Sequence, residues 1–212
     1  MSWISLAILA YFLSALVNIF DKILVSKKIP DPFVYSFFEG LLSVTVLIFA
    51  PLGFFLPPWP ILAVALLSGV IFLFALLLFF TALSKYEASR VVTLIGGLTP
   101  ILILFLAFFF LGEKLASYQI SALIFLIIGG VLVSLSREKH VYKIKGLKLT
   151  ILAALLFAVS SVMTKYVFLR QPFFNGFIWF RLGSFLAALL FLIPAGLRRR
   201  IFNMGKETRA GI

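Results

Sequence analysis

The sequence predicts an all-α fold, a polytopic bundle of transmembrane helices, and three observations support this class. Hydrophobic residues occupy 63% of the 212 positions, Phe alone occurs 26 times, and the mean hydropathy is +1.20. Soluble domains are only about 45–50% apolar. Apolar runs long enough to cross a hydrocarbon core of roughly 30 Å follow one another along the chain. These runs are apolar on all sides, whereas the strands of a membrane barrel alternate, so a β-barrel is excluded.

We expect seven transmembrane helices, because seven such runs are separated by short polar breaks. Their limits are residues 3–25, 33–55, 61–83, 88–111, 117–136, 148–168 and 172–195. Several of the runs contain polar or charged side chains, which are costly in lipid and are therefore candidates for function.

The first run carries a polar stripe. Ser14, Asn18 and Asp21 recur at i, i+4 and i+7, so they share one face of a helix, and in lipid this face must meet protein or water. Lys22 follows near the helix end, where its side chain either joins the pathway or extends to the lipid headgroups. The run has no basic segment before it and no small-residue cleavage site, so we interpret it as a membrane helix and not as a signal peptide.

The second and seventh runs each hold a charge inside the membrane. Glu39 lies in the first half of the second run, and Arg181 lies near the middle of the seventh. A charge at the bilayer centre costs on the order of 3 kcal/mol, so each is a candidate for lining a substrate pathway. The alternative is that each satisfies its charge against nearby backbone or pairs with the other. Trp179, two residues before Arg181, is a further candidate for the cavity.

The fourth and fifth runs contain residues that either bend helices or pack them closely. Pro100 removes one backbone hydrogen bond and follows Gly96 and Gly97, so the fourth run can form a hinge there. Close helix packing through Gly96, Gly129 and Gly130 explains the same residues without a hinge.

The sixth run resembles the first, which indicates an internal repeat. The segment Ile151-Leu152-Ala153 matches Ile8-Leu9-Ala10 at a constant offset, and Lys165 matches Lys22. Ser161 and Lys165 extend the polar stripe to this run. A unit of five helices is odd, so the second copy is expected to be inverted. The alternative is that two apolar helices align by composition alone.

The repeat predicts the organisation of the chain. Residues 1–136 are expected to form the first five-helix repeat, 137–147 a basic linker, and 148–212 an incomplete second repeat with two helices and a basic tail. We expect the tail, from Arg198 to Ile212, to be a loop that leads to a further helix, as in a truncated chain. The alternative is a short cytoplasmic basic tail.

The formal net charge of +12 is better explained by membrane orientation than by nucleic acid, because the basic residues lie in loops and at helix ends. Most follow the odd-numbered runs, so the positive-inside rule makes these connections cytoplasmic and the N-terminus external.

A series of residues between positions 82 and 135 resembles the EamA family of the drug/metabolite transporter superfamily. The series is Ala82-Leu83, Ala88-Ser89, Pro100, Leu111-Gly112-Glu113, Gln119 and Gly129-Gly130-Val131. The resemblance implies a five-helix unit that is usually duplicated, both termini in the cytoplasm, and a bacterial or archaeal plasma membrane. It also implies an orienting role for Glu113 in the turn after the fourth run. The orientation of the N-terminus therefore stays open between the charge pattern and the resemblance.

We expect a secondary transporter or exporter of small metabolites or drugs that works by alternating access. The expected partners are the lipid bilayer, a small-molecule substrate, a proton or other ion, and a homo- or hetero-oligomer. No enzyme activity, cofactor, metal site or nucleic acid is expected, because His140 is the only His, Cys is absent and no phosphate-binding loop occurs. The alternative is a non-transporting membrane scaffold or assembly subunit.

Overall fold

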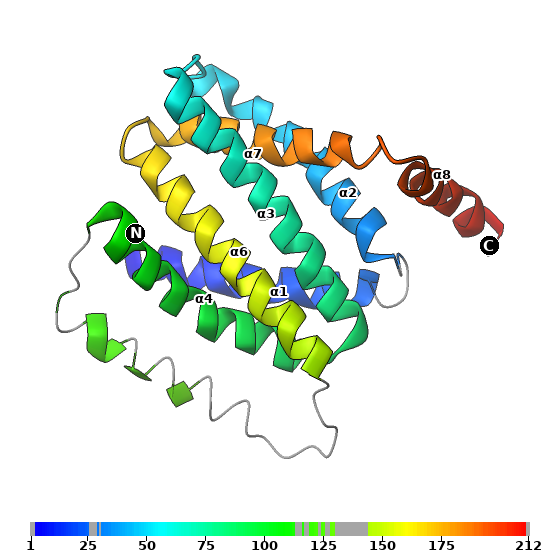
Figure 1. The fold of residues 1–212 in the computed structure, drawn as a ribbon, viewed down its shortest axis with the longest axis horizontal. Helices are drawn as coiled ribbons and strands as arrows, with labels where there is room; N and C mark the ends of the chain where they lie inside the picture. Colours follow the sequence, from blue (N-terminus) through cyan, green and yellow to red (C-terminus); the bar gives the residue numbers. More distant parts are fainter. Residues whose placement is uncertain are drawn as a thin grey trace.

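The structure is a computed structural model that describes residues 3–25, 29, 31–112, 116, 119–122, 124–125, 128–129 and 144–210. Its main elements are α1 (Trp3–Ile23), α2 (Pro32–Leu42), the 3-10 helix η2 (Ser43–Leu52), α3 (Trp59–Lys85), α4 (Ala88–Leu111), α6 (Ile144–Phe168), α7 (Phe173–Leu190) and α8 (Ala195–Ala210). No strand occurs among the described residues, and the helices form a bundle (Figure 1). The predicted fold class is confirmed.

Six segments of the described chain are long and apolar enough to cross a membrane. They are Ile4–Ile23, Pro32–Leu52, Trp59–Lys85, Ala88–Leu111, Leu147–Phe168 and Phe173–Leu190. These spans correspond to six of the seven predicted runs, and the predicted fifth run, 117–136, lies mostly outside the described residues. The chain is therefore an integral, multi-pass membrane protein.

The second span changes helix type within the membrane. Asp31 caps α2, because its side chain accepts a hydrogen bond from the Phe33 N–H, and Pro32 fits the first turn. From Ser43 the chain continues as the 3-10 helix η2, which contains Pro51 and ends at Leu52, just before Gly53. A 3-10 helix rises about 2.0 Å per residue, against 1.5 Å in an α-helix, so this half of the span is longer than its residue count suggests.

Helix α3 is the centre of the bundle and packs against α2, α6 and α7 (Figure 1). Its contact with α7 is very close at two glycines. A Cβ atom on Gly69 would lie 2.0 Å from the Phe180 carbonyl oxygen, and one on Gly183 would lie 2.2 Å from the Leu66 carbonyl oxygen. The Ser184 hydroxyl donates a 2.9 Å hydrogen bond to the Gly69 carbonyl across this contact. Small side chains therefore allow the two backbones to touch, as is common between membrane helices.

The described basic side chains gather mainly at one end of the bundle. This end holds the last turns of α1, α3 and α7 and the first turns of α2, α4 and α6, and we call it the basic end. The basic residues at this end include Lys22, Lys85, Arg90, Lys148, Arg198, Arg199 and Arg200. Helix α4 finishes at the opposite end, whereas α6 starts at the basic end (Figure 1).

The predicted loop after the seventh run is wrong, because residues 195–210 form helix α8. Ile201 is 7% exposed and joins a buried cluster that includes Val34 of α2 and Leu73 of α3. Arg200 forms an ion pair with Asp31, with Nε and Oδ2 3.4 Å apart. These contacts attach the start of α8 to the bundle, which the charge-rich sequence did not indicate.

Candidate functional site

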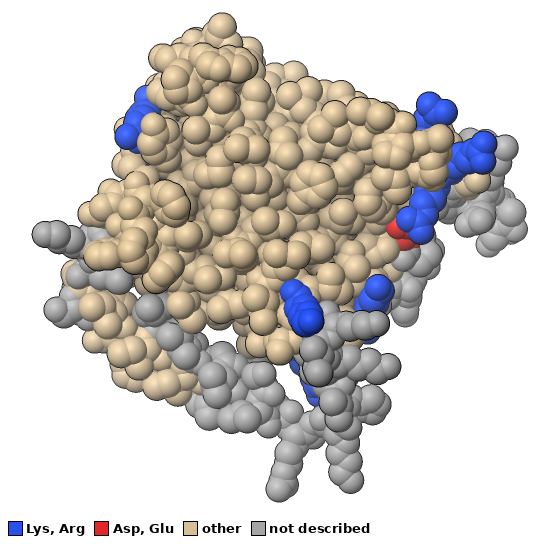
Figure 2. Space-filling view, viewed as in Figure 1, with Lys and Arg blue, Asp and Glu red and all other residues tan. Residues whose placement is uncertain are grey.

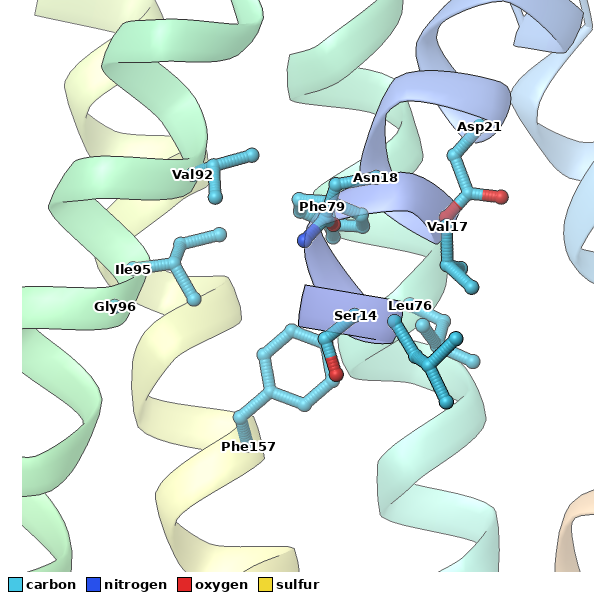
Figure 3. Close-up of a pocket in the computed structure, with 11 residues that line it drawn as sticks. Ser14, Val17, Asn18, Asp21, Leu76, Phe79, Val92, Ile95, Gly96 and Phe157 are labelled. Atoms are coloured by element: carbon cyan, nitrogen blue, oxygen red, sulfur yellow. The ribbon is translucent and has the colours of Figure 1, made fainter. Parts of the chain in front are cut away.

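A cavity of about 490 Å³ lies between α1, α3, α4 and α6. The polar stripe predicted from the sequence, Ser14, Asn18 and Asp21, lines one wall of it. Figure 3 shows Asn18 and Ser14 on α1, with Ile95 and Gly96 of α4 and Phe157 of α6 around the same space. The rest of the wall is apolar, and its other residues are Leu13, Val17, Leu76, Phe79 and Val92.

Asp21 is the only charged residue among the described residues that line this cavity. The Tyr35 hydroxyl donates a 2.5 Å hydrogen bond to its Oδ1 atom, which joins α1 to α2. Sequence reasoning missed Tyr35. The available signal was a Tyr in an apolar helix, because a phenol group inside a membrane needs a hydrogen-bond partner.

Lys22 points to the end of α3 and is not among the residues that line the cavity. Its Nζ atom donates hydrogen bonds to the carbonyl oxygens of Leu83, at 2.6 Å, and Tyr86, at 2.9 Å. The last carbonyls of a helix have no partners within the helix and carry partial negative charge, so an ammonium group stabilises them. Lys22 therefore attaches the end of α1 to the end of α3.

Glu39 and Arg181 form an ion pair between α2 and α7, with Oε1 and Nη2 3.6 Å apart. The Arg181 side chain is 21% exposed and the Glu39 side chain 38%, so the pair is only partly buried. Neither residue lines the cavity beside α1. The structure thus brings the two intramembrane charges together, and their role in a substrate pathway stays a prediction.

Trp179 contacts the segment that follows η2. Its Nε1 donates a 2.9 Å hydrogen bond to the Phe55 carbonyl oxygen, and its ring lies 5.1 Å from that of Phe54. One turn earlier, the buried Asn175 accepts a 3.0 Å hydrogen bond from the Phe55 N–H. The sequence analysis did not identify Asn175 as a candidate. Its position one helical turn before Trp179 was the available signal, because the two side chains then share one face of the helix.

Ser161 and Lys165 of α6 are exposed and do not line the cavity beside α1. The Ser161 hydroxyl donates a 2.7 Å hydrogen bond to the Phe157 carbonyl of its own helix. The polar stripe of α1 and these two residues of α6 therefore do not meet at one site.

The hinge candidates of α4 lie in an uninterrupted helix, with Pro100 inside it. No described atom lies within 4 Å of a Cβ built on Gly96, Gly97 or Gly129, so the close packing predicted for Gly96 and Gly129 is not found among the described residues. Close packing instead occurs at Gly40, Gly69 and Gly183. Glu113 and Gly130 lie outside the described residues.

Comparison with known proteins gives a family for this arrangement. A family model described as the EamA-like transporter family matches residues 1–135. Neither a curated protein nor a solved structure matches the chain. The matched segment contains the polar stripe and Glu39, whereas Arg181 lies beyond it. With more than half of its length matched, the chain belongs to the EamA-like transporter family.

Proposed function

We propose that this protein is a secondary transporter that moves a small molecule through the cavity beside α1. The observation that carries the proposal is the polar stripe of Ser14, Asn18 and Asp21, which faces a cavity of about 490 Å³ inside the membrane-spanning part of the bundle. Ligand pockets have volumes of about 300–1,000 Å³, so this space suits a metabolite or a small drug. Membership of a transporter family supports the same function.

The wall of the cavity favours a substrate with an apolar body and one polar group. Two aromatic rings, Phe79 and Phe157, and several aliphatic side chains would contact the body. Asp21 contributes a carboxylate, and no basic residue is among the described residues of the wall. In a site of low dielectric constant a carboxylate attracts a cation or a hydrogen-bond donor and repels an anion. We therefore propose a cationic or neutral substrate.

Helix α1 is suited to act as the moving wall. None of the residues in its membrane-spanning segment is buried, and the helix has few contacts with α3 and α4. Its firm attachments are at the basic end, where Lys22 binds the end of α3 and Asp21 binds Tyr35. A rotation of α1 about this end would open or close the cavity while few packed contacts are lost. Alternating access requires a part of the bundle that moves against the rest.

The ion pair of Glu39 and Arg181 lies between helices that the proposed repeat makes equivalent. Helix α2 is the second helix of the first repeat, residues 1–136, and α7 is the second helix of the incomplete repeat, residues 148–212. The pair would then connect the two inverted halves. If the two halves move against each other, this partly exposed ion pair can break and re-form. We propose that it stabilises one state of the transport cycle.

Transport by the purified chain in proteoliposomes tests this function. The compounds would be a matched set with one aromatic body and a cationic, neutral or anionic group, and flux would be recorded by solid-supported-membrane electrophysiology and by exchange of radiolabel. We expect flux of at least one cationic or neutral compound, a loss of at least tenfold in Asp21→Asn, and no change in Glu87→Gln. Glu87 is a suitable control because it pairs with Arg90 at the surface, away from the cavity.

Two results would contradict the proposal. If Asp21→Asn and Asn18→Leu both transported the compound as well as the wild type, the cavity beside α1 would not be the pathway. If no compound of the set either bound or moved, the alternative of a membrane scaffold would be favoured.

A further inference from the structure

A second cavity, of about 550 Å³, lies at the basic end of the bundle, between the last turns of α3, the start of α2 and helix α8. It is separate from the cavity beside α1, because the two share no lining residue. Its rim carries Lys85, Arg200 and Asp31, and its base is formed by apolar side chains that include Leu77, Phe33 and Val25. The site is therefore amphipathic.

The polarity of this cavity changes along the axis of α3. Leu77, Thr81, Ser84 and Lys85 recur at i, i+4, i+7 and i+8, so they share one face of the helix. Eight residues of α-helix rise about 12 Å, so this face extends from the apolar part of the membrane to its charged surface. A phospholipid has the same order of groups over a similar length, namely acyl chain, glycerol ester and phosphate.

The charged groups at the rim can bind an anion. Lys85 is exposed, and Arg200 uses its Nε for Asp31, at 3.4 Å, while its side chain is 60% exposed. A guanidinium group has five N–H donors, so Arg200 can bind a phosphate as well as Asp31. The Asp31 carboxylate is already engaged by Arg200 and by the Phe33 N–H. The hydroxyls of Thr81 and Ser84 donate to carbonyls of their own helix, so the two basic residues supply the donors.

The surroundings of the cavity favour an anionic lipid. Figure 2 shows Lys and Arg side chains mainly towards α8 and the neighbouring end of the bundle, while other residues cover the middle. The exposed Arg198 and Arg199 belong to this group. Basic residues at a membrane surface attract anionic lipids, and the charge pattern predicts that this end faces the cytoplasmic leaflet, where such lipids gather.

We propose that this cavity binds one anionic phospholipid, whose phosphate contacts Lys85 and Arg200 and whose acyl chain follows Leu77 and Phe33. The lipid would connect α8 to α2 and α3 at the place where Arg200 and Ile201 already attach it. A free anion would use the same two basic residues but would leave the apolar base uncovered, so the apolar base distinguishes the lipid from inorganic phosphate.

Native mass spectrometry of the purified protein tests this proposal. The protein would be mixed with equal amounts of phosphatidylglycerol and phosphatidylcholine of the same chain length, and the lipids that stay bound would be counted as the collision energy is raised. We expect the wild type to retain phosphatidylglycerol at least fivefold over phosphatidylcholine. The variant Lys85→Gln/Arg200→Gln should lose this preference, whereas Lys165→Gln/Arg170→Gln, with the same charge change at the opposite end, should keep it.

A second variant separates lipid from free anion and does not change any charge. Leu77→Trp fills the apolar base, so it should reduce the retention of phosphatidylglycerol while the circular dichroism spectrum stays that of the wild type. Millimolar inorganic phosphate should not displace the lipid. Equal retention of the two lipids by the wild type, an unchanged preference in the double variant, or displacement by inorganic phosphate would each overturn the proposal.

Discussion

Substituting Gly69 with alanine should weaken the contact between α3 and α7. It should destabilise the protein more than the same substitution at a helical glycine of this bundle that has open space around it. The added Cβ would lie 2.0 Å from the Phe180 carbonyl oxygen, 2.7 Å from the Ser184 nitrogen and 2.9 Å from the Gly183 Cα. All three are backbone atoms, so no side-chain rotation can relieve the overlap. The two helices must move apart.

The size of the effect follows from this geometry. Ordinary van der Waals contact begins near 3.4 Å, so the backbones must separate by about 1.4 Å at this point. Overpacking of a well-packed interior costs about 1–3 kcal/mol. One hydrogen bond across the contact, from Ser184 to the Gly69 carbonyl, would be stretched, and such a bond averages about 0.6 kcal/mol in membrane proteins. Alanine recovers up to about 1 kcal/mol through its higher helix propensity. The net destabilisation is about 1–3 kcal/mol.

The assay is reversible unfolding in mixed micelles, with the denaturing detergent fraction raised stepwise and helicity recorded by circular dichroism. Gly97→Ala is the matched control, because no described atom lies within 4 Å of a Cβ at that position. It should leave the free energy of unfolding unchanged or raise it by up to about 1 kcal/mol. If Gly69→Ala unfolded within about 0.5 kcal/mol of the control, the contact between α3 and α7 would not be as close as described.

Three other contacts lead to measurable predictions. Glu39→Gln and Arg181→Gln should each lower stability, and the double variant should lose less than their sum, with a coupling of about 1 kcal/mol because the pair is partly exposed; additive losses would contradict this. Lys22→Met should lower the free energy of unfolding by about 1–2 kcal/mol, because two carbonyls at the end of α3 lose their donor. Lys22→Arg should restore most of this stability, and an equal loss in both variants would argue against the capping role. Asn175→Leu leaves the Phe55 N–H without its acceptor. The natural chain has no Cys, so a single cysteine can be introduced in the segment 53–58, and it should react faster with a thiol reagent when Asn175→Leu is also present. An unchanged rate would contradict the role given to Asn175.

The membrane helices could be predicted well, because each span is a long apolar run that ends at a charge, a proline or a glycine. The fourth run, 88–111, and helix α4, Ala88–Leu111, have the same limits for this reason. Helix α8 could not be predicted in this way. Its sequence is rich in charge, and its start is stabilised by the burial of Ile201 against α2 and α3, which only the folded bundle shows.

In the candidate site, the residues could be predicted from their spacing along one helix, whereas their partners could not. Ser14, Asn18 and Asp21 were placed on one face by helical spacing alone, and they do line one cavity. Their setting depends on residues far along the chain, such as Tyr35 for Asp21, and spacing within a helix says nothing about such partners. The close glycines were missed because periodicity does not distinguish Gly69 from Gly96, although the first touches another backbone and the second faces a cavity.

The central position of α3 has a consequence for synthesis in the cell. This helix enters the membrane early, yet its main partners, α6 and α7, are made about sixty or more residues later, and its contacts with α4 are few. Until α7 is made, the face of α3 at Gly69 lacks the backbone that it touches in the folded bundle. Among the described residues, the main partners of α3 thus lie beyond the segment 1–135 that matches the family. We expect a chain released before α7 to leave that face of α3 without its partner and to be degraded by membrane quality-control proteases.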